Sequence, residues 1–209
     1  LEGAEGVRGI YNAVDFLTAN TKALLDGREP AISAKGKEVV IIGGGDTGSD
    51  CVGTSLRHGC AGITQIEMLP QRRGRQIIYD PRPRRAPEAK TDSSQEECLA
   101  VFGRDPRVYQ TTVKAVEADS AGNLRSVTVV GLEPEYDAQF RLTMKEVPGS
   151  ERTLPCDLLI VAAGFIGPDP SVAAAFGVDT DGRSNLAADG YATNVPKVFA
   201  CGDCRTGQS

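Results

Sequence analysis

Apolar and polar positions follow a helical period in the first part of the chain and then mark out short buried segments. Residues 8–26 place apolar side chains on one helical face, and Gly27 ends that pattern. The apolar run 38–42 predicts a buried strand, 46–57 a helix and 63–69 a second strand. These three segments have the order and length of a βαβ unit.

Residues at the ends of the predicted helices support these boundaries. His58 and Gly59 follow the helix 46–57, where glycine suits a C-cap and histidine suits the negative end of the helix dipole. We therefore expect His58 to be a capping residue and not a catalytic one. The sequence SSQE at 93–96 predicts a capping box that opens a helix ending near Phe102.

The period changes to two between residues 108 and 147. Three antiparallel strands are predicted at 108–118, 125–132 and 139–146. The apolar segment 156–164 then has the composition of a central parallel strand that ends at a glycine. The expected fold is α/β, with a parallel sheet and an inserted three-stranded antiparallel meander. This plan resembles a Rossmann-like three-layer nucleotide-binding domain.

The same pattern divides the chain into three parts. Residues 1–35 are expected to form a lead-in helix and hinge outside the nucleotide-binding unit, 36–168 the nucleotide-binding domain, and 169–209 a return segment. The segment 70–91 is rich in proline and arginine, which predicts a long loop that is solvated or faces a partner.

Composition narrows the functional classes. Of 209 residues, 40% are hydrophobic and 24% charged, as in globular proteins, and the net charge of −5 provides no basic field for nucleic acid. No apolar run approaches the roughly 18 residues that span a bilayer, and the first residues, LEGAE, are not those of a signal peptide. These features favour a cytoplasmic protein that binds a small molecule, with no nucleic acid and no membrane.

The six cysteines are scattered, which favours reduced, buried thiols over a disulfide framework. Cys201 and Cys204 have the CxxC spacing of a redox or metal-binding pair, but no second pair or neighbouring histidine accompanies them. A turn of small residues is the simpler interpretation, and a dithiol oxidoreductase that uses these two thiols stays as an alternative.

A glycine-rich turn, GGGDTG, follows the first apolar strand directly. Gly43 permits the tight turn, Gly45 lets a diphosphate approach the backbone, and Gly48 lets helix and strand pack closely. The amides of Asp46 and Thr47 lie at the positive end of the helix dipole, and Thr47 adds a hydroxyl donor. Asp46 is expected to cap the helix and to meet the phosphates through its amide or a water.

The nucleotide preference stays open because two signals conflict. Glu67 follows the glycines by about 20 residues, where a carboxylate accepts hydrogen bonds from adenosine ribose and repels a 2′-phosphate, favouring NAD. Arg72 and Arg73 follow closely and suit a 2′-phosphate, favouring NADP, unless they belong to a solvated or partner-facing loop. The expected cofactor is therefore NAD(P)H.

A second group of candidates follows the apolar strand 156–164. Ala163, Gly164 and Phe165 come at its carboxyl end, where open α/β sheets bind ligands. They are candidates for contact with the nicotinamide. The alternative is a strand-to-loop turn with Phe165 in the core.

Several longer strings make the sequence similar to one family. The chain closely resembles the small (β) subunit of glutamate synthase, within the flavoproteins that have two dinucleotide-binding domains, the pyridine nucleotide-disulfide oxidoreductase-like superfamily. The strings that carry this resemblance are VIIGGGDTGSDC at 40–51, TSLRHG at 54–59, FGRDPR at 102–107, KEVPGSE at 145–151, AGFIGP at 163–168 and GDCRTGQS at 202–209.

The resemblance implies an activity and a set of cofactors. The family's small subunit passes a hydride from NAD(P)H to FAD, and electrons then reach the glutamate-forming large (α) subunit through 4Fe–4S clusters. Gly202 and Asp203 match the family's turn that contacts FAD. Hydride transfer depends on positioning, so no catalytic residue is expected in this domain.

The sequence also departs from the family pattern. The cysteine-rich iron–sulfur segment and the FAD-binding glycine motif that begin the family's subunit are not found in it. We expect residues 1–35 and 169–209 to flank an FAD domain, and the chain alone to hold no cluster, to retain little or no FAD, and to be inactive.

Three alternatives to the glutamate synthase resemblance remain at this level. One is a paralogous NAD(P)H:acceptor flavoprotein subunit, similar to dihydropyrimidine dehydrogenase or ferredoxin:NADP oxidoreductase. Another is the dithiol enzyme. The third is a nucleotide-sensing or assembly module with the arginine-rich loop as its docking surface.

Overall fold

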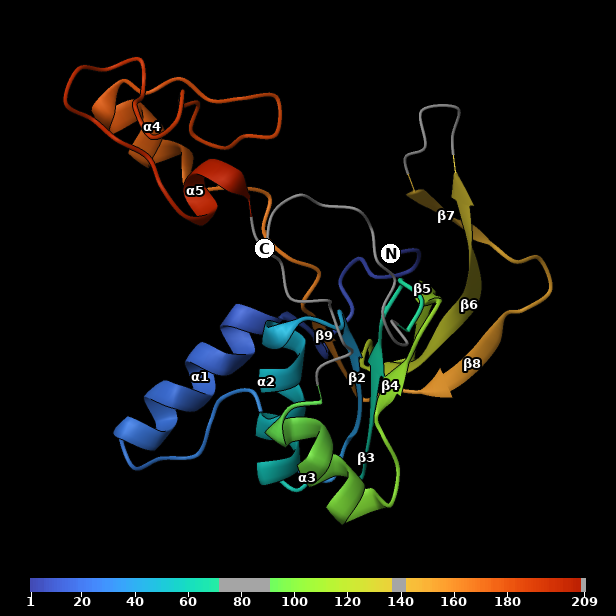
Figure 1. Ribbon diagram of the computed structural model, residues 1–209. Coiled ribbons are helices and arrows are strands. Elements are labelled where there is room, and N and C mark those ends of the chain that lie inside the picture. Colours follow the sequence, from blue (N-terminus) through green and yellow to red (C-terminus); the bar gives the residue numbers. More distant parts are fainter. Residues whose placement is uncertain (72–90, 137–141, 208–209) are drawn as a thin grey trace. The chain divides into compact units, whose positions relative to one another are not determined.

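The chain forms two compact units in the computed structural model, Leu1–Ala162 and Ala163–Ser209 (Figure 1). Residues 1–71, 91–136 and 142–207 are described. None of the helices in these ranges has the length and apolar character needed to cross a bilayer.

The first unit is built on a five-stranded parallel sheet. β2 lies at its centre and pairs with β9 on one side and with β3 on the other, and β1 pairs with the far edge of β9. In spatial order the strands are β1 (Ile10–Asn12), β9 (Leu158–Val161), β2 (Glu38–Ile42), β3 (Gly62–Ile66) and β4 (Arg107–Val108).

Helices α1 (Ala13–Leu25), α2 (Asp46–Arg57) and α3 (Ser93–Phe102) cover one face of this sheet (Figure 1). Ile41 of β2, which has no solvent exposure, points to that face and belongs to one buried cluster with Phe16 of α1 and Val52 of α2. The helices therefore pack on alternate residues of the central strands, as the period of two in a strand requires.

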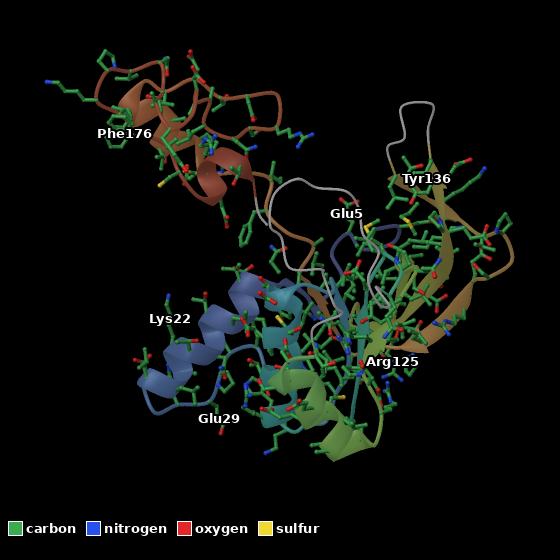
Figure 2. All side chains as sticks on the ribbon, viewed as in Figure 1. Glu5, Lys22, Glu29, Arg125, Tyr136 and Phe176 are labelled. Atoms are coloured by element: carbon green, nitrogen blue, oxygen red, sulfur yellow. The ribbon has the colours of Figure 1, made fainter. Side chains whose placement is uncertain are left out.

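A second, antiparallel sheet covers the opposite face. It contains β5 (Thr111–Ala118), β6 (Leu124–Tyr136), β7 (Leu142–Glu146) and β8 (Arg152–Pro155), with β6 pairing with the other three. Val40 of β2 and Leu159 of β9 pack against Val116 and Val127 of this sheet. The three layers predicted from the sequence are confirmed, and side chains fill the space between them while Lys22 and Glu29 lie at the periphery (Figure 2).

Two features of the first unit correct the sequence-based expectations. Residues 8–26 are not one helix: Ile10–Asn12 form β1, which pairs in parallel with β9, and the helix begins at Ala13. The expectation that residues 1–35 stand outside the nucleotide-binding unit is therefore wrong. The apolar residues of β1 lie directly before the helical pattern of α1, so the local periodicity could not separate the strand from the helix.

The inserted sheet also differs from the predicted three strands. β8 adds a fourth strand that pairs with the first half of β6. The sequence analysis missed β8 because this strand is only four residues long and mostly exposed, so it shows no clear alternation of apolar and polar residues.

Helix α3 begins as predicted, but Asp92, and not Ser93, is its N-cap, in a capping box with Gln95. The rest of the predicted βαβ unit agrees with β2, α2 and β3, although β3 ends at Ile66.

The second unit has short helices and a small core. α4 (Pro170–Phe176) and α5 (Asp203–Thr206) are joined by irregular segments. Its buried apolar residues are Ala173, Val178, Leu186 and Ala200. The unit starts at Ala163, before the expected boundary at residue 168.

Candidate nucleotide-binding site

The glycine-rich turn lies at the carboxyl end of β2. Gly43 has φ of +123°, and its N–H donates to the carbonyl oxygen of Ile66 at 2.8 Å. A Cβ atom on Gly43 would collide with the backbone carbonyl of Ala162, which follows β9. Both the backbone angle and the close approach of a neighbouring chain segment thus require glycine at this position.

The other two glycines of the motif differ in what surrounds them. Gly48 is buried, and a Cβ there would collide with the Gly43 carbonyl oxygen and lie 2.8 Å from the side-chain nitrogen of Gln65. Nothing lies within 4 Å of the position that a Cβ on Gly45 would take. Gly48 is therefore required by packing within the protein, whereas Gly45 leaves open space beside the backbone, as a bound diphosphate needs.

Helix α2 begins at this turn and directs its positive dipole end toward it. Gly45 is the N-cap and Asp46 the first helical residue, so the expectation that Asp46 caps the helix is wrong. Because the N-cap is a glycine, no side chain at this position caps the N–H groups of the first turn. Thr47 is half-buried in that turn.

Glu67 contacts the turn directly. Its Oε2 accepts from the Gly44 N–H at 3.1 Å, and its Oε1 accepts from the Leu69 N–H at 2.7 Å. The structure therefore brings Glu67 to the glycines as predicted from the spacing, but with the carboxylate already bound to backbone amides. Arg72 and Arg73, the other candidates for nucleotide selection, lie outside the described residues.

Behind the turn lies a group of buried polar residues that the sequence analysis missed. Gln65 of β3 and Gln95 of α3 are 0% and 3% exposed. Their side chains bond to each other, and Gln65 also bonds to the turn at Gly43. The sequence did contain a signal for this group: Gln65 lies within an otherwise mostly apolar strand, and a buried amide side chain needs hydrogen-bond partners inside the protein.

The remaining candidates belong to the second unit. Ala163, Gly164 and Phe165 form its first residues, and Gly164 has φ of +91°. Phe165 is 65% exposed, so the alternative that places its ring in a core is wrong.

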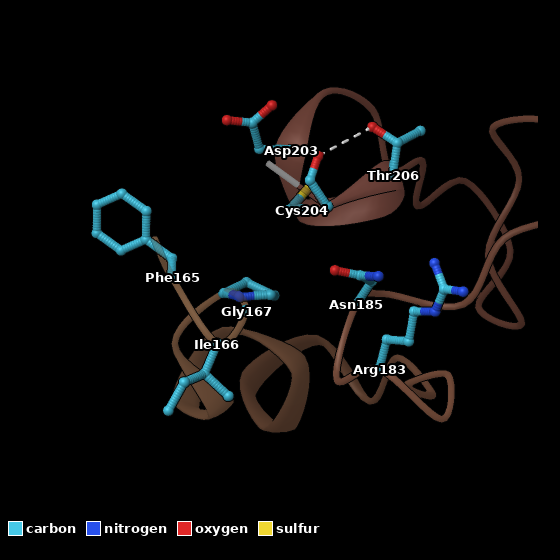
Figure 3. Close-up of a pocket in the computed structure, with 10 residues that line it drawn as sticks. Phe165, Ile166, Gly167, Arg183, Asn185, Asp203, Cys204 and Thr206 are labelled. Carbon is cyan, nitrogen blue, oxygen red and sulfur yellow. Dashed lines mark hydrogen bonds between the residues drawn. The ribbon is translucent and has the colours of Figure 1, made fainter. Parts of the chain in front are cut away.

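Phe165 lines a pocket of about 390 Å³ together with Asp203 (Figure 3). Arg183, Asn185 and Thr206 contribute polar side chains to it. Gly202, with φ of +66°, precedes Asp203 as the N-cap of α5. The structure thus brings together two of the candidates assigned to the nicotinamide and flavin ends, Phe165 and Asp203, in one concave surface of the second unit.

All six cysteine thiols are free. Burial raises the pKa of Cys51 and Cys156 to about 12, so both thiols stay protonated.

His58 bonds to neighbouring segments of the first unit. Its Nδ1 accepts from the Ala34 N–H at 3.2 Å, and its Nε2 lies 2.8 Å from Asn20 Oδ1. His58 is the C-cap of α2, as predicted. Among the described residues, no three His, Cys, Asp or Glu side chains are grouped to hold a metal ion.

A parallel sheet whose central strand ends in a glycine turn at the start of a helix is the arrangement of dinucleotide-binding domains. The chain belongs to the pyridine nucleotide-disulphide oxidoreductase family, which matches residues 97–209.

Curated relatives agree with this class. The chain is 42% identical over 207 residues to glutamate synthase [NADH] of Schizosaccharomyces pombe, a match covering 97% of the chain and 10% of that protein. It is 36% identical over 216 residues to the glutamate synthase [NADPH] small chain of Bacillus subtilis, covering 100% and 43% respectively. The chain thus spans less than half the length of these relatives.

A solved structure supports the fold. The structure of FprA, an oxidoreductase of Mycobacterium tuberculosis, in complex with NADPH matches all of this chain and 56% of its own, with a TM-score of 0.67 and 15% identity. At this identity the likeness concerns the fold alone.

Proposed function

We propose that the chain is the NAD(P)H-binding part of a glutamate synthase small subunit. The observation that carries this is the glycine turn itself: Gly43 and Gly48 are required by the surrounding backbone, while Gly45 faces open space at the start of α2. The two glutamate synthase relatives, matched over nearly the whole chain, support the particular enzyme.

The diphosphate of the nucleotide would bind at the start of α2. The Gly44 N–H is already held by Glu67, so the donors for the phosphates are the first backbone N–H groups of the helix, at Gly45, Asp46 and Thr47. The carboxylate of Asp46 at this place must turn away from the phosphates, because like charges repel.

Glu67 would accept the adenosine ribose hydroxyls beside the turn. Its carboxylate would repel a 2′-phosphate, which favours NADH, and Arg72 and Arg73 would favour NADPH if they reach that phosphate. The names of the two relatives differ in the same respect, one [NADH] and the other [NADPH], so the proposal covers both nucleotides.

The second unit would serve the reacting end. Ala163, Gly164 and Phe165 are proposed to approach the nicotinamide, and Gly202 and Asp203 to contact FAD. The pocket shared by Phe165 and Asp203 supports this, with Arg183 as a positive charge and Asn185 as a polar partner at its wall. The nicotinamide supplies the hydride when bound, and the residues of this chain bind and orient it, with no proton-transferring side chain required.

Electrons would leave through FAD and 4Fe–4S clusters to the glutamate synthase large (α) subunit. This part of the proposal rests on the resemblance of the sequence to the glutamate synthase small subunit, and the small-chain name of the Bacillus subtilis relative supports a large-subunit partner. A cytoplasmic location is supported by the six free thiols, four of them buried, because cysteines stay reduced in that compartment.

Isothermal titration calorimetry of the 209-residue protein with NADH and with NADPH tests the proposal. We expect saturable binding of at least one nucleotide, lost in Gly45→Leu, whose side chain would fill the open space beside the turn. Gly182→Leu is the matched control, because a Cβ there also meets nothing within 4 Å and Gly182 belongs to the second unit, not to the glycine turn. Failure of both nucleotides to bind the unaltered protein would contradict the proposal.

A further inference from the structure

Gln65 lies in the middle of the site although it never reaches the surface. Its side-chain nitrogen donates to the carbonyl oxygen of Gly43 at 3.0 Å, and its oxygen accepts from the Gln95 amide at 3.1 Å. Burial of an amide is costly unless its groups are bonded, and here both ends of the Gln65 amide are bonded.

Gln95 extends this chain of bonds to two helices. Its nitrogen donates to Ser49 Oγ of α2 at 2.8 Å as well as to Gln65, and its oxygen accepts from the Asp92 N–H at 3.1 Å. The start of α3, the first turns of α2 and strand β3 are thus tied to one another through a single side chain. We call Gln95, Gln65 and the Gly43 carbonyl the amide relay.

The relay determines how one peptide of the glycine turn is oriented. In a trans peptide the C=O and N–H groups point in opposite directions. Because Gln65 holds the Gly43 carbonyl toward the interior, the Gly44 N–H must point outward, where it meets the Glu67 carboxylate at 3.1 Å. Gly48 leaves the space for this arrangement, since a Cβ there would obstruct both the Gly43 carbonyl and the Gln65 amide.

We propose that Gln65 and Gln95 are positioning residues for nucleotide binding, which hold the Gly43–Gly44 peptide in the orientation that the diphosphate-binding turn requires. The proposal rests on the proposed function, in which the nucleotide binds at this turn. Neither glutamine touches the ligand. Because the diphosphate is common to both nucleotides, loss of the relay affects NADH and NADPH equally, whereas a change at Glu67 alters their ratio.

Two variants test the relay at different distances from the turn. Gln65→Met keeps the side-chain length and removes the bond to Gly43, and Gln95→Met leaves Gln65 in place but removes its partner. We expect about a tenfold loss of affinity for both nucleotides in Gln65→Met, the effect of roughly one net hydrogen bond, and a smaller loss in Gln95→Met. Thr111→Val is the matched control: it removes another part-buried side-chain bond, from the hydroxyl of the buried Thr111 in β5 to the Tyr109 carbonyl.

The amide NMR signal of Gly44 in the nucleotide-free protein provides a readout independent of binding. It should shift or broaden in both glutamine variants and stay unchanged in Thr111→Val. An unchanged Gly44 signal, or affinities equal to those of Thr111→Val in a protein that does bind NADH, would overturn the relay. Failure of the unaltered protein to bind either nucleotide would instead overturn the proposed function, and the Gly44 signal would still report whether the relay orients the peptide.

Discussion

Two glycine turns in the described part of the chain, at Gly43 and Gly202, each lead into a helix, and their surroundings differ greatly. Gly43 precedes α2 by a short turn and is enclosed by the Ala162 carbonyl, while Gly202 is the N-cap of α5 and a Cβ on it would meet nothing within 4 Å. The first turn is held by a hydrogen bond from the buried Gln65 side chain to the Gly43 carbonyl. The second belongs to a unit with a small core, and its residues are mostly exposed.

This difference indicates two kinds of binding surface. The turn in the first unit is preorganised, because its conformation is determined by packing before any ligand arrives. The turn in the second unit is not enclosed in this way: a Cβ on Gly202 would meet nothing within 4 Å, and the Gly202 carbonyl accepts from Arg205 and Thr206 of the short helix α5 itself. Two motifs that look alike in the sequence therefore differ in rigidity.

The largest expected effect separates the two turns directly. Gly43→Ala combines φ of +123° with a backbone collision and should destabilise the first unit by about 4 kcal/mol or more. Gly202→Ala meets only backbone strain, about 1–3 kcal/mol, in the second unit. Hydrogen exchange of each unit and NADH affinity measure both effects, and equal losses in the two variants would refute the contrast.

Glu67→Ala tests whether Glu67, beside the Gly43 turn, determines the preference between NADH and NADPH. Removing a charge near the ribose should improve NADPH binding relative to NADH by about fivefold, since a repulsion of about 1 kcal/mol is lost. Calorimetric dissociation constants for the two nucleotides give the ratio. Glu117→Ala, which removes an exposed carboxylate on β5, is the control. An unchanged ratio in Glu67→Ala would exclude Glu67 from nucleotide selection.

His58 tests the packing at the other end of α2. Burial lowers the pKa of its imidazole below the ordinary value, and the Glu29 carboxylate acts in the opposite direction without reversing this. Protonation is therefore easier in the unfolded chain, so the free energy of unfolding should fall as the pH drops through about 6.5 toward the lowered pKa. Protonation also removes the acceptor for the Ala34 N–H.

The comparison of urea unfolding at pH 7.5 and 5.5 measures this effect. The decrease on acidification should be smaller in His58→Gln than in the unaltered protein. An equal decrease in both proteins would show that other groups cause it.

The smallest effect is expected in the second unit. The Cys204 thiol donates to the Cys201 carbonyl at 2.9 Å, and the two thiols are free. Cys204→Ala should leave NADH affinity within about twofold, a change of at most roughly 0.4 kcal/mol. NADH-dependent reduction of a disulfide by the unaltered protein, lost in this variant, would instead support the dithiol alternative.

Local signals were enough to predict several elements. The apolar run before the glycines predicted β2, and the helical spacing with His58 and Gly59 at its end predicted α2 with its observed bounds. The requirement for glycine at 43 and 48 also followed from the sequence. These features depend on backbone preferences within a few residues, which the sequence expresses directly.

Only the tertiary structure decided the rest. β1 was recognisable as a strand only through β9, nearly 150 residues later in the chain, with Ile10 opposite Leu159. The bonds from Gln65 to Gly43 and from Glu67 to Gly44 likewise join residues from neighbouring strands and turns. The spacing of residues in the sequence indicated that Glu67 lies near the glycines. The direction of each donor and acceptor depends instead on how the sheet and the helices pack, and this packing is determined by contacts between segments that are distant in the sequence.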